Sequence, residues 1–188
     1  MIEFRIHGRG GQGSVAAAYP LAAAAFEAGI TCQAFPAFGA ERRGAPVTAF
    51  VRIGHDPIHL RAQVREPDWL IVQDDSLLID PNLTAGLKDG GAMLVNSGRD
   101  SAEVAQTFGC LALCVDATGM AVEEIGRPIP NTALLAAFLG LTGILPLDAL
   151  ATAIRGRFHG QVLDDNLRLI ERAAKSVPQG AWKETEDA

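Results

Sequence analysis

The residues best suited to chemistry begin with four glycines within six residues near the start of the chain. Gly8, Gly10 and Gly13 have the spacing GxGxxG, between an apolar run that predicts a strand over residues 2–7 and an alanine-rich segment that predicts a helix over residues 14–28. Glycines at such a junction allow a tight turn and let backbone N–H groups approach a phosphate at the positive helix end. The motif therefore predicts a phosphate-binding loop, with a turn needed only for packing as the alternative.

Two common nucleotide sites do not fit this loop. A dinucleotide fold places an acidic residue near the end of the second strand for the ribose hydroxyls, and there is none between Glu27 and Glu41. The GK[ST] sequence of a nucleoside triphosphate P-loop is also missing. The loop is therefore predicted to hold phosphate without being a typical NAD site.

The second such segment is FPAFGAERRGAP, residues 35–46, which lies between two predicted strands. Its adjacent arginines, Arg42 and Arg43, carry guanidinium groups that match phosphate oxygens in a bidentate manner. A solvated loop with an ion pair from Glu41 is the alternative, because such pairs are common and weak. Together the two segments suggest a glycine cradle for a diphosphate and an arginine clamp for another phosphate.

The other reactive residue types lack the spacing of a site. Asp74 and Asp75 follow a predicted strand, and we expect them to be structural. The histidines have no ligand spacing, so no metal site is predicted; they are His7, His55, His59 and His159. The three cysteines have no CxxC spacing and are expected to be free thiols in a reducing compartment; they are Cys32, Cys110 and Cys114.

The elements that must position these residues alternate along the chain. Further strands are predicted over residues 31–35, 46–53, 69–73, 92–96 and 111–115, and the apolar period becomes helical from Asn131 onward. This order predicts an α/β fold: a three-layer sandwich with a mainly parallel, Rossmann-like sheet and a helical C-terminal part. Residues 1–178 are expected to form one domain, and the polar, acidic residues 179–188 a tail.

Pro20 conflicts with a regular helix after the glycine loop, because an interior proline removes a hydrogen bond at a cost of about 3 kcal/mol. Either the helix tolerates a kink there, or the loop continues and Pro20 begins the helix. The two alternatives place the positive helix end differently.

Composition excludes several function classes. With 188 residues, 48% of them hydrophobic, and a formal charge of −6, the chain is expected to be a folded protein and not a general nucleic-acid binder. No signal peptide is expected, and the most apolar late stretch, residues 134–145, is too short to span a membrane. The predicted location is cytoplasmic.

Four segments resemble one family when taken together. HGRGGQG, FPAFGAERRGAPVTAFVRI, EPDWLIVQDDSLL and IPNTALLAAFLGLTG closely resemble the gamma subunit of the 2-oxoacid:ferredoxin oxidoreductases, over residues 2 to about 174. That family includes pyruvate synthase and relatives acting on 2-oxoglutarate, branched-chain and aromatic 2-oxoacids. The resemblance implies a part in the oxidative decarboxylation of a 2-oxoacid to its acyl-coenzyme A.

The resemblance also implies partners and cofactors. Thiamine diphosphate and iron–sulfur clusters are expected in alpha, beta and delta-type subunits of the same enzyme, with ferredoxin or NAD as electron acceptor. The gamma subunit is expected to bind coenzyme A, to cover the active site, and to be inactive alone with no catalytic residue of its own. Neither the particular 2-oxoacid, the acceptor nor the subunit stoichiometry follows from the sequence.

The coenzyme-binding residues that the resemblance implies fall on the motifs above. They are Gly10, Gly11, Gln12, Gly13 and Ser14 in the glycine loop, Arg42 or Arg43 in the arginine segment, and Asn131 at the start of a late helix. Coenzyme A carries a diphosphate and a separate 3′-phosphate, which fits both the glycines and the arginines. Asn131 has an alternative role as a plain helix N-cap.

Two other functions stay open at this point. One is a structural subunit that bridges partners and binds no ligand. The other is an NADP-dependent reductase in which Arg42 and Arg43 hold the 2′-phosphate, although no general acid or base stands near the loop.

Overall fold

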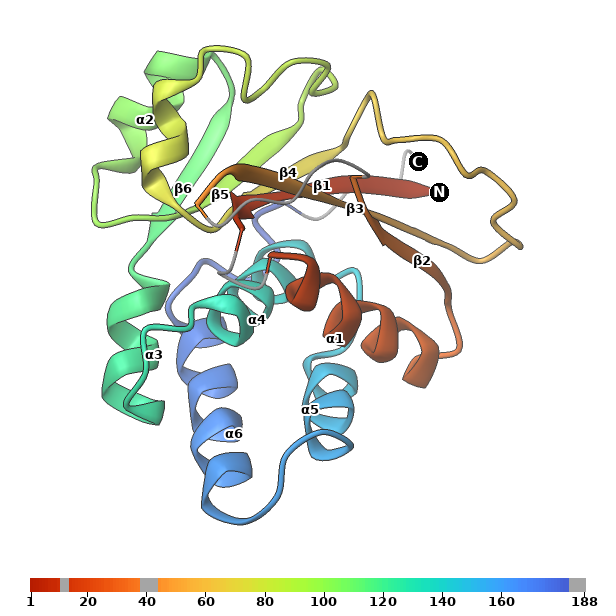
Figure 1. The fold of residues 1–188 in the computed structure, drawn as a ribbon, viewed down its shortest axis with the longest axis vertical. Helices are drawn as coiled ribbons and strands as arrows, with labels where there is room; N and C mark the ends of the chain where they lie inside the picture. Colours follow the sequence, from red (N-terminus) through yellow and green to blue (C-terminus); the bar gives the residue numbers. More distant parts are fainter. Residues whose placement is uncertain (11–13, 38–43, 183–188) are drawn as a thin grey trace.

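The fold is built on one six-stranded sheet (Figure 1). The structure, a computed structural model, describes residues 1–10, 14–37 and 44–182. The strands are β1 (Ile2–Arg9), β2 (Thr31–Pro36), β3 (Pro46–Gly54), β4 (Trp69–Val72), β5 (Ala92–Asn96) and β6 (Leu111–Val115). Their order across the sheet is β2-β3-β1-β4-β5-β6.

The direction of the strands decides which edge of the sheet can carry a site. β1, β4, β5 and β6 are parallel neighbours, whereas β3 runs antiparallel to both β1 and β2. The carboxyl ends of β1, β2, β4, β5 and β6 therefore all lie at one edge, and we name it the carboxyl edge. In open α/β sheets, ligands bind outside this edge.

Helices cover the two faces of the sheet unequally (Figure 1). The larger layer contains α1 (Ser14–Glu27), α4 (Asn131–Thr142), α5 (Leu147–Arg155) and α6 (Gly160–Lys175), whose buried residues share one core with Trp69 and Ile71. α3 (Ala117–Ile125) joins this layer. The alternate residues Leu70 and Val72 pack on the other face with η1 (Asp75–Ile79) and α2 (Ser101–Phe108).

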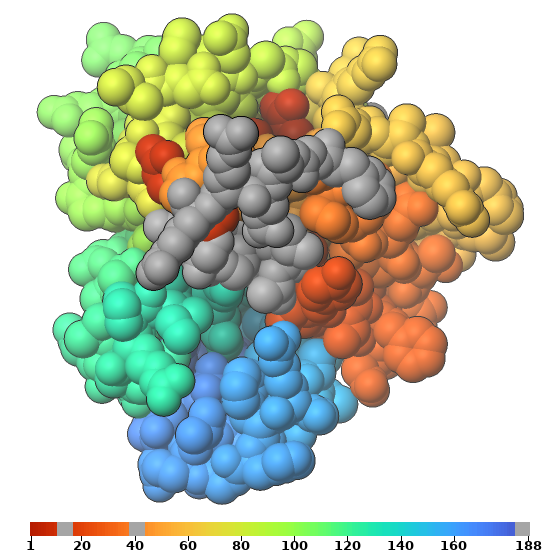
Figure 2. All heavy atoms as spheres, in the orientation of Figure 1, coloured from red at the N-terminus to blue at the C-terminus, as the bar shows by residue number. Residues whose placement is uncertain are grey.

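The space-filling view gives the same division from outside. Residues of the C-terminal part, coloured teal to blue, gather on one side of the molecule, and the yellow and green residues that precede them lie on the opposite side (Figure 2). The three-layer α/β sandwich predicted from the sequence is therefore confirmed, with three of the five neighbouring strand pairs parallel.

α4 is the helix that links the core to the carboxyl edge. Its residues from Ala133 to Thr142 are all buried, so it is surrounded by protein. The ring of Phe138 lies 5.2 Å from that of Phe4 and 5.5 Å from that of Trp69, which are near the starts of β1 and β4. Because Phe138 packs near the starts of these strands and Asn131 contacts Gln73 beyond the end of β4, α4 runs back from the carboxyl edge.

α1 settles the question that Pro20 raised. The helix begins at Ser14 and continues through Pro20 to Glu27, so the alternative in which Pro20 starts the helix is wrong. Ala17, Ala18, Leu21, Ala24 and Ala25 are buried in the core. We attribute the tolerance of the lost hydrogen bond to this packing.

The C-terminal residues that the structure describes lie against α4. The backbone N–H of Gly180 donates to Gly140 O at 2.8 Å, and that of Trp182 donates to Leu141 O at 2.9 Å. Residues 183–188 lie outside the described part of the chain, so the division into a domain of residues 1–178 and a tail of 179–188 stays a prediction.

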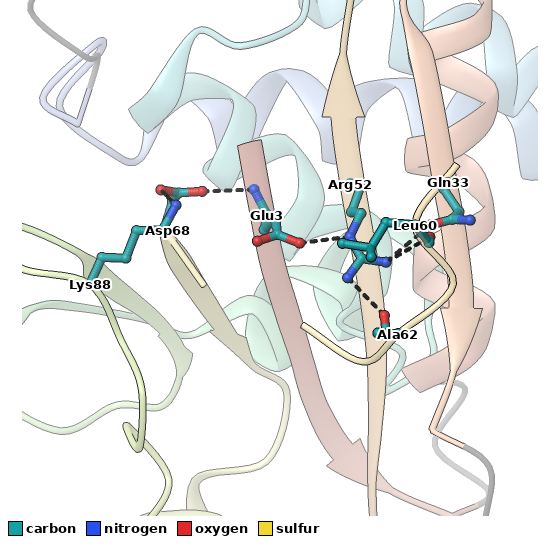
Figure 3. Close-up of polar contacts among 7 residues, drawn as sticks. All are labelled: Glu3, Gln33, Arg52, Leu60, Ala62, Asp68 and Lys88. Atoms are coloured by element: carbon teal, nitrogen blue, oxygen red, sulfur yellow. Dashed lines mark hydrogen bonds and ion pairs between the residues drawn. The ribbon is translucent and has the colours of Figure 1, made fainter. Parts of the chain in front are cut away.

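A line of polar contacts crosses the sheet at the edge opposite the carboxyl edge (Figure 3). Arg52 on β3 is 1% exposed, and its Nε donates to Glu3 Oε1 on β1 at 2.6 Å. Its other nitrogens donate to Gln33 Oε1 on β2 and to the backbone oxygens of Leu60 and Ala62. This one side chain thus joins three strands to the segment of residues 55–68.

Glu3 extends the line to the parallel half of the sheet. Its backbone N–H donates to Asp68 Oδ2 at 2.7 Å, and Asp68 also accepts from Lys88 Nζ at 2.6 Å. Asp68 directly precedes β4. The starts of β1 and β4 are therefore aligned by the same residue that neutralises Arg52.

His7 is a partly buried polar residue of β1. Its Nδ1 lies 3.4 Å from Thr48 Oγ1, and its Nε2 is closed to solvent without a hydrogen-bond partner among the described residues. Burial, together with the positive charge of Arg5, lowers the pKa of His7 from 6.5 to about 4, although Asp80 opposes the change. His7 is therefore neutral in the folded protein at pH 7.

We predict that Arg52→Met lowers the free energy of unfolding by about 3–5 kcal/mol, because it leaves Glu3 as an uncompensated, partly buried charge. The double variant Glu3→Leu/Arg52→Met should recover part of this loss. Lys175→Met, which removes an exposed i,i+4 pair with Glu171, is the control and should cost less than about 0.5 kcal/mol. Denaturant unfolding measures all three, and equal losses in the single and double variants would show that the charge of Glu3 is not the cause.

We also predict that the protein loses stability as the pH falls from 6.5 towards 4. The unfolded chain binds a proton at His7 in this range and the folded protein does not, so stability is complete above pH 6.5 and declines below it by up to about 3 kcal/mol. His7→Leu should flatten this part of the stability curve, whereas His55→Gln, at an exposed histidine, should keep it. Thermal unfolding between pH 4 and 7 is the measurement, and an unchanged slope in His7→Leu contradicts the assignment.

Candidate functional site at the carboxyl edge

A cleft of about 870 Å³ opens at the carboxyl edge over β4, β5 and β6. Polar residues line it where these strands end: residues 73–75, 96, 97, 116 and 118 contribute to its wall. Residues 128–132, which lead into α4, also line it, and Pro20, Ile154, Arg157 and Phe158 complete it. The cleft therefore joins a polar floor to an apolar wall, as small-molecule sites do.

Two side-chain amides meet on this floor. Gln73 follows β4, and its backbone N–H donates to His7 O at 2.8 Å, which extends the pairing of β4 with β1. Its Nε2 donates to Oδ1 of Asn131, the first residue of α4, at 3.0 Å. This contact connects the start of α4 to the end of β4.

Asn96 fixes the neighbouring strand ends in the same way. Its Nδ2 donates to the backbone oxygen of Gln73 at 2.9 Å and to Thr118 Oγ1 at 2.8 Å, and its Oδ1 accepts from the Thr118 N–H at 3.1 Å. One amide thus connects β4, β5 and α3. The floor of the cleft is held in place by side chains and not only by the sheet.

Gln73 has one atom that this network does not satisfy. The side chain is 4% exposed, and its Oε1 is closed to solvent with no donor in hydrogen-bond distance in the described part of the chain. A buried acceptor without a donor costs about 1–3 kcal/mol. Such a cost points to a ligand or a rearrangement that supplies the missing donor.

The aspartates of the cleft have structural partners. Asp74 caps η1 by accepting from the Ser76 N–H at 3.0 Å, and Asp116 caps α3 by accepting from the Gly119 N–H at 2.7 Å. Asp75 lies 3.8 Å from Arg99 Nε and accepts from Ser97 at 3.3 Å. These contacts agree with the structural role expected for Asp74 and Asp75.

The glycine loop and the arginine segment emerge side by side at this edge. The N–H of Gly10 donates to Ala45 O at 2.8 Å, and the N–H of Gly44 donates to Gly10 O at 3.0 Å. Gly44 and Ala45 directly follow the arginine pair in the sequence. The two motifs that the sequence analysis combined are therefore adjacent where the structure describes their flanks.

Arg9 connects these flanks to the cleft. Its Nη1 donates to Gly44 O at 3.0 Å, and its Nε donates to Ser76 Oγ at 2.9 Å. The same guanidinium lies 3.5 Å from Asp74, a residue of the cleft wall. Arg9 thus ties the end of β1 both to the arginine segment and to the segment after β4.

The predicted site residues divide into two groups. Gly10 and Asn131 both lie at the carboxyl edge, and Ser14 begins α1. The alternative role of Asn131 as the helix cap is wrong, because Pro130 is the N-cap residue and α4 has no side-chain cap. Gly11, Gln12, Gly13, Arg42 and Arg43 lie outside the described residues, so their roles stay predictions.

Several polar residues of the cleft were missed by the sequence analysis, among them the three whose hydrogen bonds hold its floor in place. These three are Gln73, Asn96 and Thr118. The signal that could have found Gln73 and Asn96 is their position, since each stands at the end of a short buried strand that a parallel sheet brings to one edge. Thr118 carries no such signal, because its role depends on its contact with Asn96.

The described residues contain neither a metal-ligand cluster nor a membrane-spanning helix. Among the residues that the structure describes, no group of three or more histidine, cysteine or acidic side chains could hold a metal ion. The same residues include no helix with the length and apolar character needed to cross a bilayer.

Comparison with known proteins identifies the family. The sequence model of the pyruvate ferredoxin/flavodoxin oxidoreductase family matches residues 3–176. The chain is 51% identical to the pyruvate/ketoisovalerate oxidoreductases common subunit gamma of Thermococcus kodakarensis, across 92% of this chain and 95% of that protein. It is 49% identical to the pyruvate synthase subunit PorC of Methanocaldococcus jannaschii, with the same coverage of both chains.

A solved structure supports the same assignment. The pyruvate oxidoreductase subunit PORC of Thermotoga maritima superimposes with a TM-score of 0.83 and 43% sequence identity, over 93% of this chain and 95% of that one. The family match, the relatives and this structure agree along nearly the whole chain. The chain therefore belongs to the pyruvate ferredoxin/flavodoxin oxidoreductase family, among its gamma subunits.

Proposed function

We propose that this chain is the accessory gamma subunit of a heteromeric 2-oxoacid oxidoreductase, in which it binds coenzyme A and covers the catalytic site. The names of the relatives support the kind of complex, because they are subunits of pyruvate synthase or of pyruvate/ketoisovalerate oxidoreductases. Pyruvate and branched-chain 2-oxoacids are accordingly the proposed substrates. These names do not mention coenzyme A, so the proposal that this chain binds it rests on the chain's own residues.

The observation that carries this part of the proposal is the backbone pairing of Gly10 with Gly44 and Ala45. It places the flanks of the glycine loop and of the arginine segment together, next to the residues that line the cleft. Coenzyme A needs such a combination, because its diphosphate and its 3′-phosphate are separate anionic groups on one ligand. These contacts continue the ladder of β1 and β3 beyond Arg9 and Pro46, so both motifs begin at the carboxyl edge.

Each motif has a defined task in this proposal. Backbone N–H groups of Gly11, Gln12 and Gly13, together with the start of α1 at Ser14, would hold the diphosphate. Arg42 or Arg43 would hold the 3′-phosphate through charge-assisted hydrogen bonds. Asn131 would contact the coenzyme from the start of α4.

The remaining cofactors are assigned to partner chains. No described cluster of residues fits a metal centre, and the three cysteines are free thiols. Burial raises the pKa of Cys32 to about 12, so this residue stays a protonated, unreactive thiol and is not suited to ligating an iron–sulfur cluster. Thiamine diphosphate and the iron–sulfur clusters are therefore proposed in alpha, beta and delta-type subunits, with ferredoxin or NAD as the acceptor, and the free thiols suit a cytoplasmic complex.

Calorimetric titration of the assembled complex tests the proposal against its alternatives. Coenzyme A should bind and NADP should not, while the isolated chain should show no turnover of a 2-oxoacid. Binding of NADP in place of coenzyme A would favour a reductase, and binding of neither would favour a purely structural subunit.

We predict that Arg42→Ala/Arg43→Ala raises the KM for coenzyme A, while thiamine-dependent decarboxylation without coenzyme A persists. Each lost charge-assisted contact should cost about 1.5–3 kcal/mol, or about ten- to a hundredfold. Steady-state kinetics of the complex with varied coenzyme A measures the effect.

The matched control is Arg61→Ala/Arg65→Ala, which removes two exposed arginines from the segment between β3 and β4, at the opposite edge of the sheet. It should leave the KM for coenzyme A unchanged. An unchanged KM in the Arg42/Arg43 variant would show that these arginines do not contact coenzyme A and have a surface or interface role.

A further inference from the structure

The two edge strands of the sheet, β2 and β6, differ in how their outer backbone groups are satisfied. In β6, Val115 O accepts from the Ser97 N–H just beyond β5, so the alternate residue Cys114 points its backbone groups outward. The N–H of Cys114 donates to Ser101 Oγ at the start of α2, at 2.9 Å. The edge of β6 is therefore partly closed by the chain's own helix.

The outer groups of β2 have no such partner in the described part of the chain. Ala37 and Thr48 form a hydrogen-bonded pair beyond β2, because the Ala37 N–H donates to Thr48 O at 2.7 Å. Such pairs alternate along an antiparallel ladder, so Cys32 and Ala34 direct their N–H and C=O groups away from β3. Among the described residues no hydrogen bond reaches these groups, and β2 has none of the charged side chains that usually prevent edge pairing.

The helix beside this edge exposes an apolar face. α1 packs against β2 and β3 and, within its own layer, against α4 and α5. Tyr19, Ala23 and Phe26 share the face that points away from these elements, and Tyr19 is 54% and Phe26 80% exposed. Glu27 is the one charged residue of the helix. Since a helix that is apolar on every side is normally buried on every side, this face is expected to be covered.

The exposed rings have enough area to contribute substantially to an interface. An aromatic side chain buries about 150–250 Å², so the exposed fractions of Tyr19 and Phe26 correspond to roughly 200–330 Å² per chain. The rings of two chains would then bury about 400–660 Å², roughly a third to a half of the ~1,200 Å² of a small specific interface. The edge of β2 adds to this area.

We propose that β2 and α1 form an interface between two copies of this chain, in which β2 pairs antiparallel with β2 of the second copy about a two-fold axis at Gln33. In this register Cys32 of each copy faces Ala34 of the other, and each pair exchanges two backbone hydrogen bonds. The same axis sets the two α1 helices antiparallel, with the exposed apolar face of each next to the other.

The outward donors of β2 select this register. An axis at Ala34 would set Cys32 against Pro36, which has no N–H to donate. An axis at Cys32 would need the N–H of Ile30, which already donates to Ala25 O at 2.9 Å. The axis at Gln33 is the one in which every outward N–H of β2 finds an acceptor.

Charge favours a second copy over a charged partner surface. Each chain carries a formal charge of −6, so two copies repel each other over most of their surfaces. β2 has no charged residue, and the exposed face of α1 has one only at Glu27, the end of the helix. This strip can therefore meet its own equivalent without setting like charges opposite each other.

Disulfide formation in the assembled complex tests the register, and its readout does not depend on coenzyme A. Each variant also carries Cys32→Ala, so that the natural thiol of β2 takes no part. Gln33→Cys should link the two copies on mild oxidation, because residues on the axis form a non-hydrogen-bonded pair with Cα atoms about 4.5 Å apart, within the range of disulfides. Thr31→Cys, on the same face of β2, is the matched control and should give no link, since its equivalents lie more than about 13 Å apart.

A second variant keeps the test decisive if Gln33→Cys, which removes an acceptor of Arg52, disturbs the sheet. Thr31→Cys/Phe35→Cys should link the copies, because these two positions face each other in the same register, whereas neither substitution alone should do so. Mass spectrometry of the linked peptides identifies the bond. A link in Thr31→Cys alone, links only to cysteines of other subunits, or no link in either the Gln33 variant or the double variant overturns the inference.

Discussion

The ion pair between Arg52 and Glu3 is the interaction on which the arrangement of the sheet depends. Arg52 is almost fully buried, and its hydrogen bonds reach β1, β2 and the segment between β3 and β4. A buried arginine is tolerated only when its donors and its charge are satisfied. Since Glu3 also binds Asp68 ahead of β4 through its backbone N–H, the register of four strands is coupled at one edge.

This register determines what meets at the opposite edge. A slip of one residue between β1 and β3 would turn Phe4 and Ile6 away from the helices and would separate Gly10 from Ala45. The position of Gln73 next to the end of β1 follows from the pairing of β1 with β4 in the same way. The glycine loop, the arginine segment and the cleft are therefore brought together by contacts that lie a full strand length away.

α4 also fixes the arrangement of residues at the carboxyl edge, through its packing in the core. Phe138 packs against rings near the starts of β1 and β4, and the helix then reaches the carboxyl edge, where Asn131 meets Gln73. Because α4 is surrounded by protein, its start has little freedom to move relative to the strand ends. The residues at the start of this helix and at the three strand ends are therefore held in a fixed arrangement.

The sequence predicted the features that depend on local pattern. Short apolar runs predicted all six strands, and the alanine-rich segment after the glycines predicted the helix α1. That the glycines between β1 and α1 hold a phosphate stays a prediction. The antiparallel direction of β3 and the pairing of Gln73 with Asn131, which are 58 residues apart, depend on the folded chain and carry no local signal. The interpretation of Asn131 as a helix cap failed because the N-cap position of α4 is occupied by Pro130.

Hydrogen–deuterium exchange of the assembled complex, with and without coenzyme A, tests the central claim most directly. If the coenzyme binds at the carboxyl edge, exchange should slow at Gly10, Gly44, residues 73–76 and residues 129–132, and should stay unchanged in residues 55–68 at the opposite edge. Protection confined to the other subunits, with no change in these segments, would contradict the account.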